Sequence, residues 1–349
     1  MYANRLLPTT VVGSYSVPEW LERFKTDYYQ HRISAAYLHD IHETAIKAAL
    51  KDQENAGIDI VSDGELRRDN DIDYLLARIA GIQIPSPSKS FYFDYFDACL
   101  TTQLAMDEPT PIGLAADFAF TRSYTDRPIK FSFTGPFSLA HRVRNSAYAD
   151  PNDLVLALAE RLNAEARLLV AAGAQILQID EPFLAGYPEQ VAVAIDGINR
   201  VTKGVDADWA LHVCYGNRYA RPSWEGHYDF LFPAILDAQV GQIVLEFARK
   251  GYDDLRLLSR YGWDRGLGVG VIDVKTDAVE TPQVVANRIR RALDVVDPDR
   301  LVVNPDCGLR HVSPEIARAK LRAMTAGADL VRAEIEAPST AVEAVTAED

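Results

Sequence analysis

The sequence contains little sulfur and no long apolar run. Three of its 349 residues are cysteine and three are methionine. Three cysteines cannot form a disulfide framework, so the thiols are expected to be reduced, as they are in the cytoplasm. No apolar stretch approaches the roughly 20 residues that span a bilayer, and no apolar segment of a secretion signal follows residues 1–5. The sequence therefore predicts a cytoplasmic protein that does not act at a membrane.

Positive charge is also scarce. The chain has 36 lysines and arginines against 50 aspartates and glutamates, which gives a formal net charge of −14. Nucleic acids and anionic membranes are bound through basic patches, so neither is an expected partner. With 48% hydrophobic and 25% charged residues the composition is that of an ordinary globular protein. A single α/β domain covering residues 1–349 is expected, because barrels of this class reach that length.

Short apolar runs alternate along the chain with longer segments of helical periodicity. Eight runs have the character of strands buried on both faces, as in a parallel sheet. They are 9–15, 58–65, 129–136, 174–181, 209–214, 242–248, 267–273 and 301–308. The helical segments include 37–56, 153–172, 282–295 and 314–326. This alternation predicts a (β/α)₈ TIM barrel, with an open doubly wound sheet as the alternative.

Residues 67–128 interrupt the alternation between the second and third strands. A connection of this length is usually functional or has structure of its own. It contains the aromatic segment 91–96, and we expect a hairpin or helical excursion that covers one mouth of the barrel. A shorter insertion, 217–227, follows the fifth strand.

Polar and metal-binding residues gather where the predicted strands end, which is where barrel enzymes place their active sites. His212 and Cys214 are two positions apart on one strand, so their side chains point the same way. Glu246 and Cys307 end two other strands. Two thiolates, an imidazole and a carboxylate suit tetrahedral zinc. The alternative is a satisfied core pair with a buried Cys307, and Cys99 is expected to be structural.

A zinc ion with two thiolates and a carboxylate carries excess negative charge. Such a site generates hydroxide poorly, but it holds a substrate thiol as a nucleophilic thiolate. Glu246 is the ligand expected to give up its position to that thiol. The predicted reaction is displacement by sulfur at an alkyl carbon. Metal-assisted hydrolysis, the rival chemistry, would favour neutral, histidine-rich ligands.

Two further carboxylates, Glu65 and Asp180, end strands at the same mouth. They are predicted to hold a substrate ammonium together, which favours an amino-acid thiol as acceptor. The alternative is that they cap the helices that follow. Asp63 is expected to orient a neighbouring residue.

Taken together, six motifs resemble the catalytic half of cobalamin-independent methionine synthase, in its short, single-barrel "core" form. They are Val-Gly-Ser-Tyr at 12–15, Asp-Gly-Glu at 63–65, Thr-Gly-Pro at 134–136, Ile-Asp-Glu-Pro at 179–182, His-Val-Cys-Tyr at 212–215 and Asn-Pro-Asp-Cys-Gly-Leu at 304–309. The motifs occur in the order of that family and cover nearly the whole chain. The N-terminal barrel of the full-length family has no counterpart in this sequence.

The resemblance implies a zinc-dependent methyltransferase that converts homocysteine to methionine. Zinc would be bound by the four residues already named, His212, Cys214, Glu246 and Cys307. The amino group of homocysteine would be held by Glu65 and Asp180, and its carboxylate would lie near Ser14. Thr134 and Arg142 are predicted to be substrate-binding residues as well.

The sequence departs from the family on the side of the methyl donor. Arg142 stands where the family has a tryptophan that stacks on the pterin of methyltetrahydrofolate, and Gly186 stands where it has a pterin-binding glutamate. The family's Asp-Ile-His is replaced by Asp273-Val274-Lys275. Glu246, Asp273 and Lys275 are the predicted catalytic residues. The departures predict a different donor, methylcobalamin or another methylcorrinoid, delivered free or by a corrinoid carrier protein.

Other interpretations remain open at this point. A zinc alkyltransferase of the epoxyalkane–coenzyme M type has a similar fold and zinc motif, and Arg142 or Lys275 would then meet a sulfonate. A second alternative is a barrel that binds a metal or a corrinoid and catalyses no reaction. A third concerns the donor alone, which would be methylfolate or an unidentified molecule. The aromatic segment 91–96 is expected to shield the site, and the 217–227 insertion to rim the donor entrance.

Overall fold

A ring of parallel strands forms the core of the computed structural model, which describes residues 5–105 and 110–337. Six strands pair side by side in the order β2, β4, β5, β6, β7, β8. Their bounds are β2 Lys130–Thr134, β4 Ile176–Asp180, β5 Asp208–Val213, β6 Gln242–Leu245, β7 Gly266–Ile272 and β8 Leu301–Pro305. Nearly every residue in them is buried, as expected for strands covered on both faces.

Three isolated parallel bridges close this sheet into a ring. Thr9 pairs with Val303 of β8, Thr10 pairs with Ile60, and Val61 pairs with Ile129, which precedes β2. The predicted barrel is thereby confirmed. The first two expected strands, 9–15 and 58–65, are corrected to these single bridges. The reason is local, because side chains capture backbone groups that a longer ladder would use; the amide of Thr9, for example, donates to the Asp59 carboxylate.

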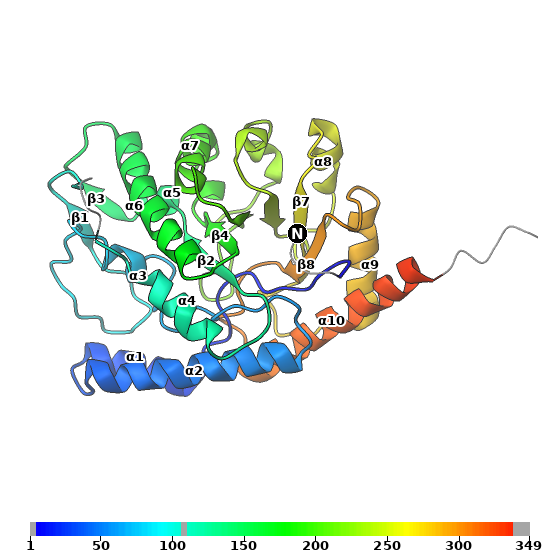
Figure 1. The fold of residues 1–349 in the computed structure, drawn as a ribbon, viewed down its shortest axis with the longest axis horizontal. Coiled ribbons are helices and arrows are strands. Elements are labelled where there is room, and N and C mark those ends of the chain that lie inside the picture. The colour runs from blue at the N-terminus through cyan, green and yellow to red at the C-terminus, as the bar shows by residue number, and fades with distance from the viewer. Residues whose placement is uncertain (1–4, 106–109, 338–349) are drawn as a thin grey trace, which may run out of the picture.

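Helices surround the strands, as Figure 1 shows. The predicted helices are present as α2 Ala35–Asn55, α6 Pro151–Ala171, α9 Pro282–Leu293 and α10 Pro314–Glu336. Others are α1 Glu19–Tyr29, α5 Pro136–Ala140, α7 Val191–Thr202 and α8 Leu255–Tyr261. Short 3₁₀ turns occupy Leu184–Gly186, Pro188–Gln190, Tyr228–Leu231 and Ala234–Asp237. None of the helices in the described ranges is long and apolar enough to cross a membrane.

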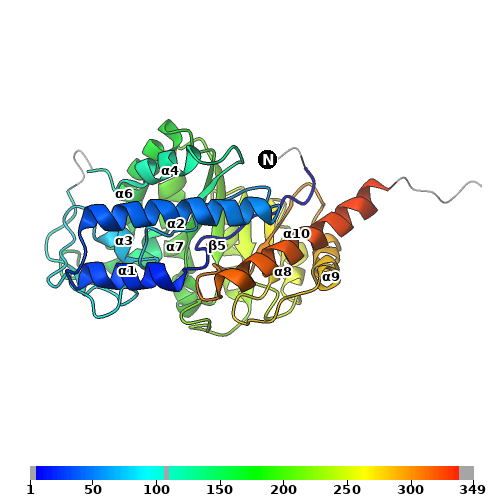
Figure 2. The same ribbon diagram turned by 90° about the horizontal axis from the view of Figure 1, so that it is seen from below.

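Side-chain caps explain where the four predicted helices begin. Ser34, Asp150, Thr281 and Ser313 each accept a hydrogen bond from an amide in the first turn. In three of the four a proline follows the cap directly, where its missing N–H is not needed. The last helix, α10, extends well beyond the predicted end at residue 326 and runs below the barrel in line with α2 (Figures 1 and 2).

The long insertion contains short elements of its own. They are α3 Asp73–Leu76, β1 Ala98–Leu100 and α4 Leu114–Arg122. The strand β1 pairs in parallel with β3, Val143–Asn145, which follows α5. The start of α4 is anchored by Glu165 of α6, whose carboxylate accepts hydrogen bonds from four successive amides, 112–115. The insertion is therefore attached both to the strand after α5 and to the helix α6.

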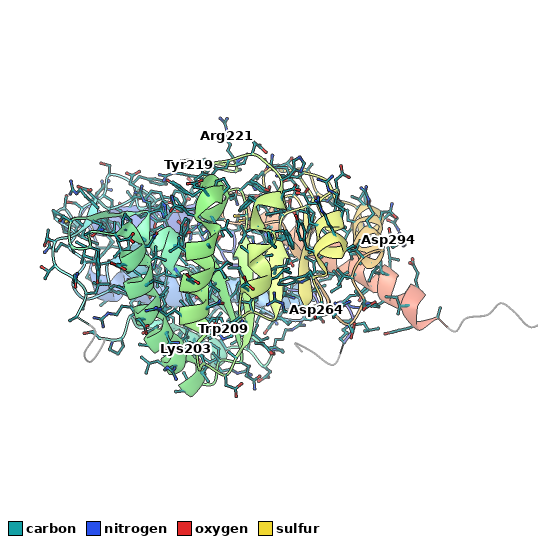
Figure 3. The ribbon with its side chains drawn as sticks, turned by 90° about the horizontal axis from the view of Figure 1, so that it is seen from above. Lys203, Trp209, Tyr219, Arg221, Asp264 and Asp294 are labelled. Atoms are coloured by element: carbon teal, nitrogen blue, oxygen red, sulfur yellow. The ribbon has the colours of Figure 1, made fainter. Side chains whose placement is uncertain are left out.

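The two ends of the barrel are distinguished in Figure 3. Trp209 at the start of β5 and Asp264 just before β7 lie toward one edge, and Tyr219 and Arg221 lie at the opposite edge. Tyr219 and Arg221 belong to the segment that follows β5, so this second edge is the carboxyl end of the strands. In barrel enzymes that end carries the active site.

Candidate functional site

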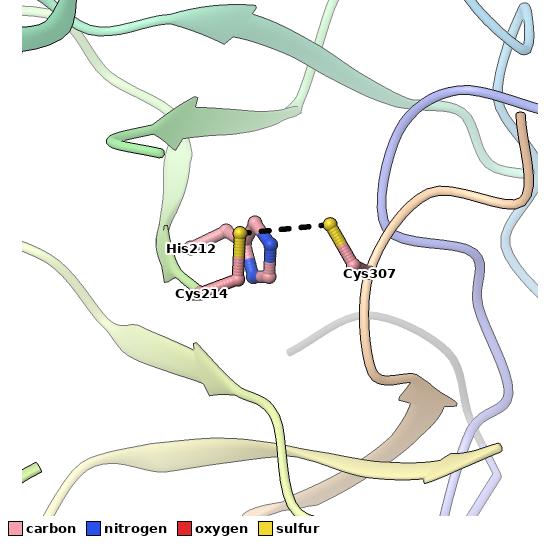
Figure 4. A group of neighbouring side chains, drawn as sticks. All are labelled: His212, Cys214 and Cys307. Carbon is pink, nitrogen blue, oxygen red and sulfur yellow. Dashed lines mark hydrogen bonds between the residues drawn. The ribbon is translucent and has the colours of Figure 1, made fainter. Parts of the chain in front are cut away.

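A thiol and imidazole cluster lies at the carboxyl ends of the strands. His212 is on β5, Cys214 is the first residue after β5, and Cys307 lies shortly after β8 (Figure 4). One ligand atom from each of the three residues lies within 4.8 Å of the others. The two sulfur atoms are 3.6 Å apart. Two thiols and an imidazole at this spacing are suited to a soft divalent metal such as zinc.

The orientation of His212 supports metal binding. Its Nδ1 lies 3.0 Å from the carbonyl oxygen of Val244, so Nδ1 carries the proton and donates to that carbonyl. Its Nε2 is buried and makes no hydrogen bond of good geometry among the described residues, although, despite burial, the neighbouring Cys307 thiol raises the pKa of His212. A buried nitrogen lone pair without a donor is unusual, and a metal ion beside the two thiols would satisfy it.

Cys307 is protonated in the absence of a cation. Its hydrogen bond to Cys214 and its burial raise the pKa of the Cys307 thiol well above the ordinary value. A coordinated metal cation reverses this effect, because it stabilises the thiolate directly. Metal binding is therefore expected to release a proton from this pair.

Glu246 lies outside the group formed by the other three predicted ligands. Its Oε1 accepts a hydrogen bond from Arg249 Nε at 3.0 Å, and its Oε2 accepts one from Lys275 Nζ at 2.8 Å. The Glu246 side chain is fully buried, so the two cations compensate a charge that water does not reach. Its role as a fourth ligand stays a prediction, and it requires the carboxylate to move toward the other three residues.

A cavity of about 300 Å³ opens beside the cluster. Its walls bring together most of the residues that the sequence predicts to bind metal or substrate. They are Ser14, Glu65, Arg142, Asp180, His212, Cys214 and Cys307. Four other predicted residues are not among the walls: Thr134, Glu246, Asp273 and Lys275. Among these four, Thr134 donates its hydroxyl to the carbonyl of Asp71, and Asp273 accepts from the amide of Lys275 at 2.8 Å.

The two carboxylates expected to bind an ammonium both face this cavity. Glu65 Oε1 accepts hydrogen bonds from Arg68 at 3.0 Å and from the Ser132 hydroxyl at 2.8 Å. Asp180 accepts one from Gln178 at 2.6 Å, and burial raises the pKa of Asp180 to about 7. A cationic group bound here would reverse that shift, because it favours the ionised carboxylate.

Helix capping, the alternative for Glu65 and Asp180, is done at α5 by Glu181, and a second buried carboxylate, Asp306, binds the amides of a turn. Glu181 accepts hydrogen bonds from the first amides of α5, at Phe137 and Ser138. Asp306 accepts them from three amides after β6, at 247–249. Both lie next to predicted site residues in sequence. They fix the backbone from which those residues project.

Several residues of the site are missed by the sequence argument. Arg68 and Arg249 each follow a predicted carboxylate by three positions, a spacing that was available as a signal. Tyr95 and Trp224 line the cavity from the segments 91–96 and 217–227, which were expected to shield the site and to rim the donor entrance, but neither residue was singled out. Trp224 lies against Gly186, where an added Cβ would be 2.2 Å from the indole.

With this geometry established, comparison with known proteins decides the family. Residues 7–330 match the family described as "Cobalamin-independent synthase, Catalytic domain". The chain belongs to this family. The family, the barrel fold and the enzyme class predicted from the motifs are thereby confirmed.

Relatives of nearly the same length are named methionine synthase. The protein from Saccharolobus islandicus is 38% identical over 331 residues, covering 95% of this chain and 96% of its own. The protein from Sulfurisphaera tokodaii is 35% identical over 334 residues, covering 95% and 94%. The short, single-barrel form is therefore shared with these relatives.

Solved structures agree with this assignment. The B12-independent methionine synthase from Shewanella sp. W3-18-1, in complex with selenomethionine, is 28% identical, with a TM-score of 0.82 over 95% of this chain and 99% of that one. A methyltransferase from Methanosarcina mazei, 16% identical, covers 96% and 95% at a TM-score of 0.65 and shares the fold.

The comparisons correct the expected donor. The family is described as cobalamin-independent and the Shewanella enzyme as B12-independent, which contradicts a methylcorrinoid donor and leaves a corrinoid carrier protein unsupported. The departures at Arg142, Gly186 and Lys275 do not by themselves identify a donor. Trp224, from a different segment, lies against Gly186.

Proposed function

We propose that this protein transfers a methyl group to the thiol of homocysteine and so forms methionine. Zinc would be bound by His212, Cys214 and Cys307, with Glu246 as an exchangeable fourth ligand. The observation that carries the proposal is the buried, unpartnered His212 Nε2 beside two thiols 3.6 Å apart. When bound, zinc supplies a positive charge that lets a substrate thiol ionise near neutral pH and remain nucleophilic.

The acceptor is oriented by the protein's own carboxylates. Glu65 and Asp180 bind the ammonium of homocysteine, and Ser14 lies near its carboxylate, on the wall of the same cavity. Arg68 holds Glu65 in place by donating a hydrogen bond to its carboxylate. This arrangement selects an amino-acid thiol over coenzyme M, because two carboxylates repel a sulfonate.

Lys275 and Asp273 act on Glu246. Asp273 accepts a hydrogen bond from the Lys275 amide and so fixes the backbone of the lysine. The Lys275 ammonium is within hydrogen-bond distance of Glu246, and it would hold that carboxylate if a substrate thiol replaced it as a ligand. The charge of Glu246 is thus compensated in both positions.

As donor we propose methyltetrahydrofolate, because the family is described as cobalamin-independent. The sulfur–methyl bond forms as the N5–methyl bond breaks, and the proton lost by the homocysteine thiol balances the proton that N5 of tetrahydrofolate gains. The relatives named methionine synthase support homocysteine as acceptor. Metal binding by Cys214 and Cys307 requires reduced thiols, and we propose the cytoplasm as the compartment on that ground.

The test is methionine formation by zinc-loaded enzyme from homocysteine, with methyltetrahydrofolate and methylcobalamin offered separately. We expect methionine from methyltetrahydrofolate, none when coenzyme M replaces homocysteine as acceptor, and no turnover in Cys307→Ser. Cys99→Ser, which removes a thiol far from the cluster in sequence, is the matched control and should remain active. Absence of methionine with both donors, or full activity of Cys307→Ser, would overturn the proposal.

A further inference from the structure

Two arginines flank one aromatic ring at the mouth of the cavity. The guanidinium of Arg142 lies 4.3 Å from the centroid of the Tyr95 ring, and that of Arg218 lies 4.4 Å from it. The three residues come from different parts of the chain: Tyr95 from the long insertion, Arg142 from the end of α5 and Arg218 from the segment after β5. All three line the same cavity as the cysteine–histidine cluster.

Neither arginine has an acidic partner within residues 5–105 and 110–337. Other arginines near the site do, since Arg68 pairs with Glu65 and Arg249 pairs with Glu225 and Glu246. The Nε of Arg142 is in addition buried without a hydrogen-bond partner. The aromatic ring that the two guanidinium groups flank stabilises them only in part, so an anion that enters the cavity would gain from their uncompensated charge.

The position of the pair identifies which reactant brings that anion. The acceptor thiol must reach the cluster at the strand ends, beside Glu65 and Asp180. Arg142 follows α5 and Arg218 follows β5, and both line the cavity. Tyr219, next to Arg218 in sequence, lies at the outer edge of the molecule in Figure 3, so a second reactant entering from this edge would meet Arg218.

An aromatic surface accompanies the two charges. The Trp224 indole lies in edge contact with Phe183, with ring centroids 5.6 Å apart. It lies so close to the Cα of Gly186 that no side chain fits between them. Both rings line the cavity, and Trp224 is only half-buried. A flat heterocycle has a surface to stack on here.

We infer that Arg142 and Arg218 bind a carboxylate of the methyl donor and that Trp224 packs against the donor's flat ring system. This inference rests on the proposed function and names the residues that select the donor. Charge-assisted hydrogen bonds from two guanidiniums favour a carboxylate over an uncharged group. Arg142, which departs from the family pattern, would thus recognise the charged end of the donor.

The first experiment measures equilibrium binding of tetrahydrofolate, the methyl-free donor, to the full zinc-loaded chain by isothermal titration calorimetry. We expect Arg142→Gln and Arg218→Gln each to weaken binding by about tenfold to a hundredfold. Arg144→Gln is the matched control, because Arg144 is exposed and pairs with Asp97 on the surface. A second ligand, 6-methyltetrahydropterin, has the ring without the carboxylates and should bind wild type and both variants equally.

A second experiment tests the aromatic surface. Trp224→Ala should weaken the binding of 6-methyltetrahydropterin by about threefold to tenfold. Trp224→Phe retains an aromatic ring and should weaken this binding less. In steady-state assays the arginine variants should raise KM for methyltetrahydrofolate and leave KM for homocysteine unchanged.

Three outcomes would overturn the inference: unchanged tetrahydrofolate binding in both arginine variants, a rise in KM for homocysteine alone, or an effect confined to methylcobalamin with its phosphodiester. The second outcome would mean that the arginines bind the carboxylate of homocysteine, and the third that they bind the phosphodiester of a corrinoid. Loss of tetrahydrofolate binding in the variants of a chain that forms no methionine would support this inference while the proposed function fails. The two claims are therefore separable.

Discussion

The carboxylate of Glu246 is bound by the ammonium of Lys275, with 2.8 Å between Oε2 and Nζ. Both side chains are almost completely buried, and Arg249 contacts the other carboxylate oxygen. The fourth expected metal ligand is therefore held by a competing cation. The two cations neutralise the Glu246 carboxylate and so compete electrostatically with a metal ion for it.

Replacement of the lysine tests this competition. Lys275→Met leaves a buried carboxylate with one cation instead of two, so the metal-free chain should lose about 1–3 kcal/mol of unfolding free energy. Zinc should stabilise the variant more than it stabilises wild type, because the Glu246 carboxylate is no longer neutralised by a lysine. Urea unfolding with chelator and with excess zinc measures both quantities.

Lys51→Met is the control for this experiment, since Lys51 is exposed and its ion pair in the described part of the chain is with the nearby Glu54. It should leave the zinc effect unchanged. Equal stabilisation of wild type and Lys275→Met by zinc would show that Glu246 stays with its cations and is not a ligand.

The barrel and the cluster were predictable because both depend on strands. A buried parallel strand is a short apolar run, and the position after it lies at the carboxyl end of the barrel whatever the loops do. His212, Cys214 and Cys307 could therefore be brought together without knowledge of the loops. The first two strands were predicted too long, because the hydrogen bond between Asp59 and the Thr9 amide is not visible in an apolar pattern.

The surroundings of the cluster could not be predicted in the same way. The partner of Glu246 depends on where the Lys275 side chain turns after β7 ends. The donor side depends on loops, and Trp224 reaches Gly186 from a segment nearly forty residues later in the chain. A comparison made position by position cannot detect a ring supplied from elsewhere.

Arg68 is predicted to be essential for the folded chain. It is buried, donates to Glu65 and to the carbonyl of Ser132, and lies 4.0 Å from Asp63. Arg68→Met leaves two buried carboxylates without this cation, so we expect a loss of about 3–5 kcal/mol in urea unfolding. The exposed Arg122→Met should change stability by less than about 0.5 kcal/mol. A small effect of Arg68→Met would contradict the burial of this ion pair.

His42 on α2 is predicted to make stability depend on pH. Burial, together with the charges of Lys25 and Arg67, lowers the pKa of His42 to about 2. Below its ordinary value of about 6.5 the unfolded chain binds a proton that the folded chain does not, so the unfolding free energy falls as pH decreases.

Between pH 7 and pH 5 this residue should account for a loss of about 1–2 kcal/mol. In His42→Gln the loss over that interval should be smaller by this amount, as measured by urea unfolding at several pH values. His39→Gln, at an exposed position on the same helix, should retain the dependence of wild type. An identical pH dependence in His42→Gln and wild type would refute the assignment.

The most direct test of the central claim uses Co²⁺ in place of zinc, because its absorption reports thiolate coordination. Homocysteine is titrated into the cobalt-loaded chain, with homoserine, which has a hydroxyl in place of the thiol, as the matched ligand. We predict that homocysteine alone increases the thiolate-to-cobalt absorption and that Cys307→Ser loses this response. An unchanged spectrum while homocysteine binds would show that the acceptor thiol does not reach the cluster, and the proposed chemistry would be wrong.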